Sequence, residues 1–157
     1  MMSKISLFIF RCVVLTGPIH AAFAADCFKH AAQRYAVPVQ LLQAIALQES
    51  SGNARAFNRN RNGSYDIGLM QINSAWLPTL SRHGISSEHL FDPCVSVLVG
   101  AWILSNNFAR LGYNTQGLGA YNAVTPHKRE HYARQVLGRL SQVAARQGQV
   151  VGRSLEN

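Results

Sequence analysis

Apolar residues recur at helical spacing along most of the chain. The positions Val39, Leu42 and Ile45 lie on one face of a predicted helix. Pro38 suits the first turn of this helix, and Gly52 suits its end. The same reasoning predicts further helices, over residues 26–36, 74–83, 93–112, 115–122 and 126–147.

The segment from residue 53 to residue 72 interrupts this helical pattern. Residues 58–64 are asparagine, arginine, glycine and serine, and Asn62-Gly63 is typical of a hairpin turn. We therefore expect a short two-stranded ribbon around residues 57–72. Strand content is small elsewhere, and 48% of the 157 residues are hydrophobic. The sequence thus predicts one mainly α domain of the α+β type, in which a minor β-ribbon accompanies the helices.

The first 24 residues have the features of a secretory signal peptide. Lys4 gives a positive start, residues 5–16 are nearly all apolar, and Ala22-Phe23-Ala24 has the small-x-small pattern of a cleavage site. An uncleaved N-terminal anchor is the alternative. The predicted organisation is a signal peptide, a globular domain and a polar tail, over residues 1–24, 25–147 and 148–157.

Export changes what the charge and the cysteines mean. Removing residues 1–24 takes away two of fifteen basic residues and none of seven acidic ones, so the formal charge falls from +8 to +6. A basic exported protein could bind a nucleic acid, an acidic membrane or an anionic polymer, and charge alone does not choose among them.

Cys27 and Cys94 remain after removal of residues 1–24, and an even pair of cysteines in an exported chain predicts one disulfide. The histidines lack metal-ligand spacing, so we predict no metal and no cofactor.

Glu49 is the acid whose surroundings suit the cleavage of a glycosidic bond. The leaving oxygen must receive a proton, and a carboxyl group keeps its proton near neutral pH only where apolar surroundings raise its pKa. Glu49 lies four residues after Ile45, beside the apolar face of its helix, and is either half-buried there or turned to solvent at the helix end. The other acids lie in polar segments or look like helix caps, with the exception of Asp66.

Three short motifs, Glu49-Ser50, Gly68-Leu69-Met70-Gln71-Ile72-Asn73 and Ala120-Tyr121-Asn122, follow one another in the chain. In this order, over about residues 27–135, they resemble the motifs of the lytic transglycosylases, the SLT branch of the lysozyme-like enzymes that cut peptidoglycan. The resemblance implies a lysozyme-like fold in which Glu49 is the acid and then the base. It assigns the substrate contacts and their support to Ser50, Met70, Gln71, Asn73, Tyr121 and Asn122, with Met70 lining the sugar groove.

Other residues resemble the transglycosylases that accompany secretion systems and pili. These are Cys27, Asp92-Pro93-Cys94 and Gly100–Leu104, and they support the Cys27–Cys94 disulfide. One position departs from the family pattern, because Val124 stands where a glycine usually follows the Ala-Tyr-Asn-Ala run. This departure leaves the conformation of the loop after Asn122 open.

Asp66 has two interpretations. The run from Asp66 to Ser74 also resembles the block that carries the second carboxylate of animal-type lysozymes, so Asp66 would stabilise the oxocarbenium ion or bind the sugar. Lytic transglycosylases generally need no second carboxylate, because the acetamido group of the substrate assists departure. A turn aspartate that bonds its own backbone is the alternative.

The expected activity is cleavage of the β-1,4 bond between N-acetylmuramic acid and N-acetylglucosamine in the periplasm, with a 1,6-anhydro product. Expected partners are peptidoglycan glycan strands and components of a type III or type IV secretion system, a pilus or a conjugation apparatus. We expect a monomer that binds no nucleic acid, since no base-stacking motif accompanies the charge. A muramidase and a non-catalytic wall-binding module are the alternatives. Three arginines are each either solvated or able to meet substrate carboxylates, namely Arg55, Arg59 and Arg61.

Overall fold

The computed structural model describes residues 19–155 and the side chains of residues 26–147. The helices are α1 (Ile19–Tyr35), α2 (Val39–Ser50), α3 (Leu77–Ser81), α4 (Pro93–Leu111), α5 (Thr115–Gly119) and α6 (Pro126–Leu155). The strands are β1 (Phe57–Arg59), β2 (Tyr65–Ile67) and β3 (Ile72–Asn73), and the 3-10 helices are η1 (Ser74–Trp76) and η2 (Glu88–Phe91). The predicted class, mainly α with a small β region, is confirmed.

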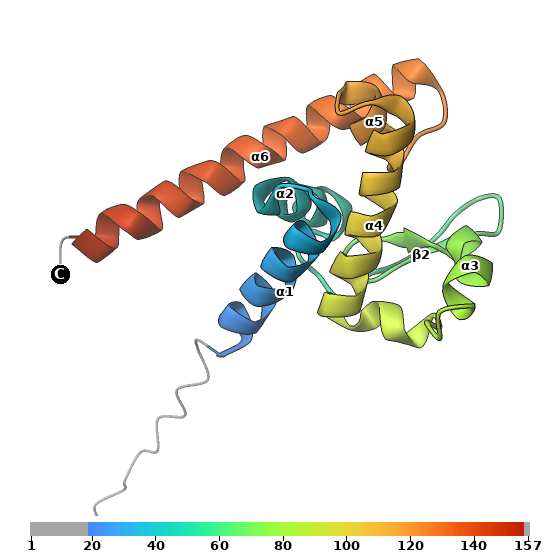
Figure 1. Cartoon of the computed structure of the whole chain (residues 1–157), viewed down its shortest axis with the longest axis horizontal. Coiled ribbons are helices and arrows are strands. Elements are labelled where there is room, and N and C mark those ends of the chain that lie inside the picture. Colours follow the sequence, from blue (N-terminus) through green and yellow to red (C-terminus); the bar gives the residue numbers. More distant parts are fainter. Residues whose placement is uncertain (1–18, 156–157) are drawn as a thin grey trace, which may run out of the picture.

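Helix α4 stands at the centre of the fold. In Figure 1 it runs through the middle of the molecule, with α1 and α2 on one side and the sheet and α3 on the other. Helix α1 packs along α4, and α6 packs across α2 and α5. Val97, Ala101 and Leu104 of α4 are fully buried. Among the described helices α4 is also long and apolar enough to cross a membrane, but these buried positions make it the core helix of the domain.

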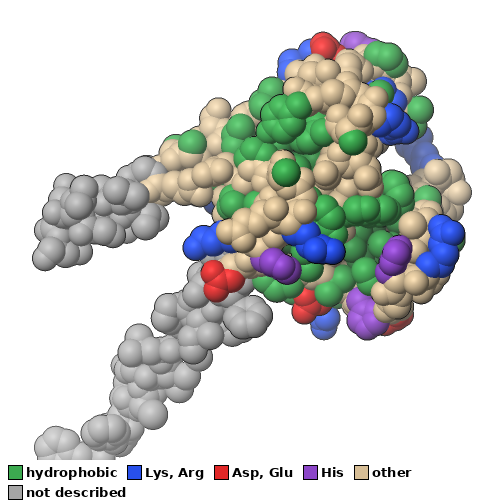
Figure 2. All heavy atoms as spheres, in the orientation of Figure 1, with side chains coloured by type: hydrophobic (Ala, Val, Ile, Leu, Met, Phe, Trp, Pro, Cys, Tyr) green, Lys and Arg blue, Asp and Glu red, His purple; other side chains and the backbone are tan. Residues whose placement is uncertain are grey.

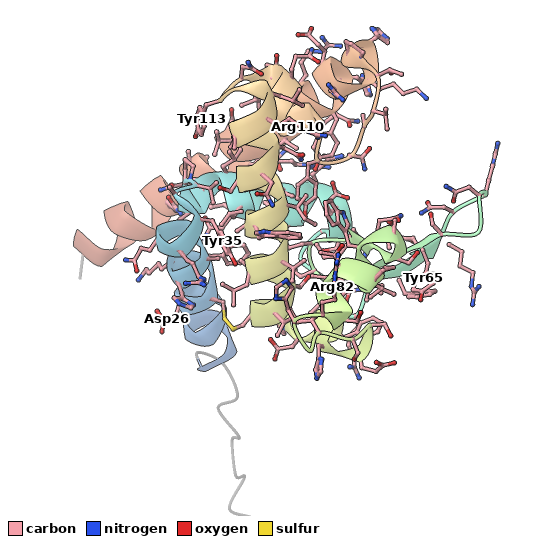
Figure 3. All side chains as sticks on the ribbon, turned by 45° about the vertical axis from the view of Figure 1, so that its right-hand side comes forward. Asp26, Tyr35, Tyr65, Arg82, Arg110 and Tyr113 are labelled. Atoms are coloured by element: carbon pink, nitrogen blue, oxygen red, sulfur yellow. A yellow bond between two sulfur atoms is a disulfide. The ribbon has the colours of Figure 1, made fainter. Side chains whose placement is uncertain are left out.

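Helix α1 begins earlier than the sequence predicts. A helix capped by Asp26 is expected over residues 26–36, whereas α1 starts at Ile19 and runs through Asp26. Residues 19–25 are mostly alanine, the strongest helix former, so they favour extension of the helix ahead of Asp26. Of the predicted signal peptide, residues 1–18 lie outside the described part of the chain. Cys27 and Cys94 form the predicted disulfide, which joins α1 to the first turn of α4 with their Cα atoms 5.0 Å apart (Figure 3).

The sheet has three antiparallel strands where the sequence predicts a two-stranded ribbon. Strand β2 lies between β1 and β3, and the register pairs Arg59 with Tyr65 and Asp66 with Asn73. The turn between β2 and β3 needs Gly68, whose φ is 75° and whose added Cβ would overlap the backbone carbonyl of Leu90. This turn returns the chain to the sheet and so creates the third strand.

The predicted helix over residues 74–83 is divided into η1 and α3. Asn73, the residue before the predicted start, caps η1, since its side chain accepts a hydrogen bond from the Ala75 backbone amide at 3.0 Å. Pro78 has no N–H to donate, which favours a new helix start there. Helix α6 continues to Leu155 instead of ending at 147, and its residue Leu137 is 43% exposed.

The surface carries its basic excess in dispersed form. Figure 2 shows Lys and Arg side chains scattered over the visible face rather than gathered into one stripe. Within residues 26–147 a single ion pair forms, between the exposed Arg134 and Glu130 side chains, with an N–O distance of 3.6 Å. Most basic side chains of this part therefore keep their charge available to solvent or to a ligand.

Candidate active site

A cleft of about 520 Å³ opens between the end of α2, the sheet and the turn after α5. Six of the predicted site residues line it, namely Glu49, Asp66, Gln71, Asn73, Tyr121 and Asn122. The other lining residues are Asn60, Arg61, Asn62, Ser64, Ile72, Trp76 and Ile103. The fold thus brings residues from all three sequence motifs to one cleft.

Glu49 lies in the last turn of α2, which ends where Ser51 adopts a left-handed conformation (φ 54°). Burial raises the pKa of the Glu49 carboxyl to about 7. The hydroxyl of Tyr132 donates a hydrogen bond to Glu49 Oε1, which lowers the pKa, and the negative charge of Asp66 raises it further. Desolvation is the largest of the three effects. Glu49 is therefore half-buried on the helix face and not turned to solvent.

Two tyrosine side chains lie beside Glu49. Tyr121 and Tyr132 are stacked, with ring centroids 6.4 Å apart and planes 12° from parallel. The Tyr121 hydroxyl donates to the backbone carbonyl of Met70 at 3.0 Å. Burial, followed by the negative charge of Glu49, raises the pKa of both phenols well above the ordinary value. Both hydroxyls consequently stay protonated near neutral pH and serve as hydrogen-bond donors.

Asp66 lies on the sheet side of the cleft in polar surroundings. Its Oδ1 accepts a hydrogen bond from the side-chain amide of Asn73 at 2.7 Å, and its Oδ2 accepts one from the side-chain amide of Asn60 at 2.9 Å. Asn73 comes from the neighbouring strand β3, and Asn60 from the β1–β2 loop. Asp66 therefore bonds side-chain amides, and not its own backbone as a simple turn aspartate would.

Gln71 and Ser50 hold the Gly68–Asn73 block in place. Gln71 is 9% exposed and has a left-handed backbone (φ 48°). Its amide donates to the carbonyls of Gly68 at 2.9 Å and Ala56 at 3.3 Å, and its oxygen accepts from the Asn58 amide. Ser50 Oγ donates to the Leu69 carbonyl at 2.8 Å. The contacts of both side chains are with the protein itself, and Gln71 also reaches the cleft wall.

Met70 lies beneath the cleft. Its side chain is fully buried, and a Cβ added to Gly100 would stand 2.8 Å from its terminal methyl group. The structure thus places the Met70 side chain in the core and not on the groove surface, where the sequence puts it. Its carbonyl takes part in the site by holding Tyr121. Because Gly100 has no side chain, α4 packs directly against Met70 and the Tyr121 hydroxyl at this residue.

The loop after Asn122 is closed by local hydrogen bonds in spite of the departure at Val124. The Ala123 amide donates to the Gly119 carbonyl at 3.0 Å, and Arg129 Nε donates to the Ala123 carbonyl at 3.1 Å. Val124 itself is 83% exposed. A side chain at this position therefore meets solvent, and Asn122 keeps its place on the cleft.

Sequence reasoning does not find three residues of the site, Tyr132, Trp76 and Asn60. Tyr132 lies one helical turn before Val136, so the helical spacing of apolar residues indicates that both are buried. A buried tyrosine needs a hydrogen-bond partner for its hydroxyl, and this requirement could have indicated a role for Tyr132 in the site. Trp76 lines the cleft and packs edge-on against Trp102, with ring centroids 5.3 Å apart. Asn60 lies in a loop and gives no such signal.

The donor set of the cleft suits proton transfer. In the part of the chain with described side chains, no group of three His, Cys, Asp or Glu residues is placed to hold a metal ion. A carboxyl group with a pKa of about 7 is able to give a proton and to take one back at the same pH. Asp66 places a second carboxyl group on the same cleft.

Comparison with known proteins gives first the class of fold and then the family. The X-ray structure of an inactive mutant of the lytic transglycosylase Slt from Pseudomonas aeruginosa superposes with a TM-score of 0.63 at 22% identity. The match covers 78% of this chain and 24% of that one, so the chain spans about a quarter of that protein's length. The transglycosylase SLT domain family matches residues 26–136, and the chain belongs to this family.

Curated relatives extend the similarity over most of the chain. Invasion protein IagB of Salmonella typhimurium is 42% identical over 134 residues, which is 82% of this chain and 83% of that protein. Protein IpgF of Shigella flexneri is 40% identical over 126 residues, 77% of this chain and 83% of that one. X polypeptide of Escherichia coli is 41% identical over 101 residues, 64% and 60% of the two chains.

Proposed function

We propose that the protein is a lytic transglycosylase that cleaves the β-1,4 bond between N-acetylmuramic acid and N-acetylglucosamine and leaves a 1,6-anhydro end. The observation that carries this proposal is Glu49, a carboxyl group with a pKa of about 7 on the cleft wall of a chain in the transglycosylase SLT domain family. A group that titrates near neutral pH is protonated in a large share of the molecules and is able to act as a general acid.

Glu49 acts twice in this reaction. As an acid it gives its proton to the glycosidic oxygen while the bond to the anomeric carbon breaks through an oxocarbenium-like state. As a carboxylate it then takes the proton of the muramic acid 6-hydroxyl, whose oxygen bonds to the anomeric carbon and closes the anhydro ring. The first proton leaves with N-acetylglucosamine and the second restores Glu49, so no water is consumed.

Tyr132 orients the Glu49 carboxyl group in this reaction, and Asp66 acts on it through its charge. The Tyr132 hydroxyl bonds Glu49 Oε1 and fixes the plane of the carboxyl group, and Oε2 has no hydrogen-bond partner within residues 26–147. We assign proton transfer to Oε2. The negative charge of Asp66 favours both the protonated form of Glu49 and the forming cation.

Asp66 also favours a second candidate function, a lysozyme-type muramidase. In that reaction water, and not the 6-hydroxyl, attacks the anomeric carbon, and the product keeps a reducing end. A non-catalytic wall-binding module fits less well, because such a module has no use for a proton donor with a pKa of about 7. A nucleic-acid binder fits least, since the basic side chains are dispersed over the face shown in Figure 2.

We further propose that the enzyme works in the periplasm as a monomer, where it opens the wall locally for a secretion system, a pilus or a conjugation apparatus. Residues 1–24 have the features of a signal peptide, and the Cys27–Cys94 disulfide suits an oxidising compartment. One relative is called an invasion protein, which supports a role in secretion. Cell fractionation should recover the protein, shortened by its signal, in the periplasmic fraction, and recovery of the full-length chain with the membrane would contradict this.

The deciding experiment incubates the purified protein with peptidoglycan and weighs the released muropeptides. Anhydro ends support the transglycosylase, because each such end is lighter by one water than a hydrolysed end. Reducing ends would show a muramidase. Undigested strands that retain the protein would show a binding module.

A further inference from the structure

Arg61 is the one basic side chain on the cleft among the residues whose side chains are described. It is exposed, and no carboxylate lies within ion-pair distance of it in this part of the chain. The two acids of the cleft are engaged elsewhere, Glu49 with Tyr132 and Asp66 with two asparagine amides. The positive charge of Arg61 is therefore available to a ligand.

The loop that carries Arg61 has a defined shape. The backbone N–H of Asn60 donates to the backbone carbonyl of Ser64 at 2.8 Å, and the backbone N–H of Gly63 donates to the backbone carbonyl of Asn60 at 3.1 Å. Asn62 Oδ1 accepts hydrogen bonds from the Ser64 backbone amide and from its hydroxyl, at 3.1 and 2.8 Å. Although the hairpin reaches out beyond the helices (Figure 3), its backbone is closed on itself.

Asn60 fixes this loop relative to the catalytic cleft. Its side chain bonds Asp66, which belongs to β2 and lines the same cleft as Glu49. The backbone next to Arg61 is consequently held at a set position on the cleft rim. When a ligand binds, only the Arg61 side chain has to be ordered, and this keeps the entropic cost of binding small.

We propose that Arg61 forms a subsite for the free carboxylates of peptidoglycan stem peptides. The proposal rests on the proposed function, because that function puts a glycan strand in the cleft. Stem peptides branch from the lactyl group of muramic acid, so they leave a bound strand at the cleft rim. A guanidinium group pairs with a carboxylate through two parallel N–H···O bonds, a geometry that a general positive charge does not supply. Arg61 thereby selects strands whose stem carboxylates are free over strands in which they are amidated.

Arg59 supplies a matched control within the same hairpin. It has the same charge and is also exposed, but it does not line the cleft. Its guanidinium carbon lies 5.7 Å from the ring centre of Phe57. Alternate residues of a strand point to opposite faces, and the neighbouring Asn58 bonds the cleft residue Gln71, so Arg59 belongs to the other face of the sheet.

The test measures binding without turnover. Proteins that carry Glu49→Gln are sedimented with peptidoglycan sacculi whose free carboxylates are either intact or converted to amides with carbodiimide and ammonia. Adding Arg61→Gln should weaken binding to intact sacculi about three- to tenfold and leave binding to amidated sacculi unchanged. Adding Arg59→Gln, which removes the same net charge, should change binding to either by less than about twofold.

Two results would overturn the subsite. Equal losses in the Arg59 and Arg61 variants would show that only net charge matters, and unchanged binding of the Arg61 variant to intact sacculi would show that Arg61 contacts no stem. Because the sedimentation test measures binding and not cleavage, its result does not depend on the outcome of the muropeptide assay. A protein that prefers free carboxylates through Arg61 but releases no muropeptides would keep the subsite and lose the proposed activity.

Discussion

Two carboxyl groups line one cleft in opposite surroundings. Glu49 comes from the end of a helix, is half-buried beside two stacked tyrosine rings, and accepts one hydrogen bond, from Tyr132. Asp66 comes from the middle strand of a small sheet, and each of its oxygens accepts a hydrogen bond from an asparagine amide. Glu49, on the helical side of the cleft, thus lies in apolar surroundings, and Asp66, on the sheet side, lies in polar surroundings.

This difference assigns different work to the same chemical group. Removing water from Glu49 penalises its charged form, and its pKa rises to about 7. The side-chain amides of Asn60 and Asn73 donate hydrogen bonds to Asp66 and replace water that its carboxylate loses in the cleft. A proton donor and a negative charge can therefore coexist in one cleft, since the protein solvates the two carboxyl groups differently.

The strongest test of the comparison replaces Glu49 by Gln. The amide has nearly the shape of the protonated carboxyl group but cannot donate and retrieve a proton, so the rate of muropeptide release should fall by about two to four orders of magnitude. The measurement is the initial rate on polymeric peptidoglycan, with sedimentation to show that the variant still binds the wall. A Glu49→Gln protein that releases muropeptides at a near-normal rate would end the assignment.

The same variant should change how stability depends on pH. Since the pKa of Glu49 is about 7 in the folded protein and 4.5 in an unfolded chain, folding favours its protonated form. The stability gained in this way is fully present below pH 4.5 and is lost as the pH rises through 7. Between pH 4.5 and pH 8 the wild type should lose about 3 kcal/mol more of its unfolding free energy than Glu49→Gln, which has no such titration. Urea unfolding at both pH values measures this, and parallel losses would mean that Glu49 is not desolvated.

The sequence predicts the helical side of this comparison better than the sheet side. Glu49 is found because apolar residues at helical spacing precede it in its helix, and the same spacing predicts α4. The third strand is not found, since it depends on Gly68 lying against the Leu90 carbonyl, a contact between segments far apart in the chain. Tyr132 is missed for the same reason, because a helix pattern shows that it is buried and not which group its hydroxyl meets.

The sheet side is tested by replacing Asp66 with Asn. The change removes the negative charge at nearly constant shape, and in a partly desolvated cleft such a charge is worth a rate factor on the order of a hundred. Kinetics on polymeric peptidoglycan measure the loss, and the product should be anhydro-capped as before. A rate within about twofold of the wild type would instead show that the reaction does not need the charge of Asp66, and that the acetamido group of the substrate assists departure.

Asn60→Ala is the control for this prediction. It removes one of the two hydrogen bonds to Asp66 and keeps the charge, so it should lose much less activity than Asp66→Asn. Equal losses in the two variants would show that the polar arrangement of the sheet, and not the charge, is what the reaction needs.

The smallest expected effect comes from Tyr132→Phe, which keeps the ring on Tyr121 and removes the hydroxyl from Glu49. The lost hydrogen bond leaves the carboxyl less well oriented, and the rate at neutral pH should fall about three- to tenfold. That hydrogen bond also lowers the pKa of Glu49, so without it the pKa rises further and the alkaline limb of the pH–rate profile moves to higher pH. Tyr121→Phe, which loses a bond to the Met70 carbonyl and not to Glu49, should leave this limb in place. If the alkaline limb stays in place in Tyr132→Phe, or moves equally in both variants, the hydrogen bond from Tyr132 does not set the pKa of Glu49 and burial alone does.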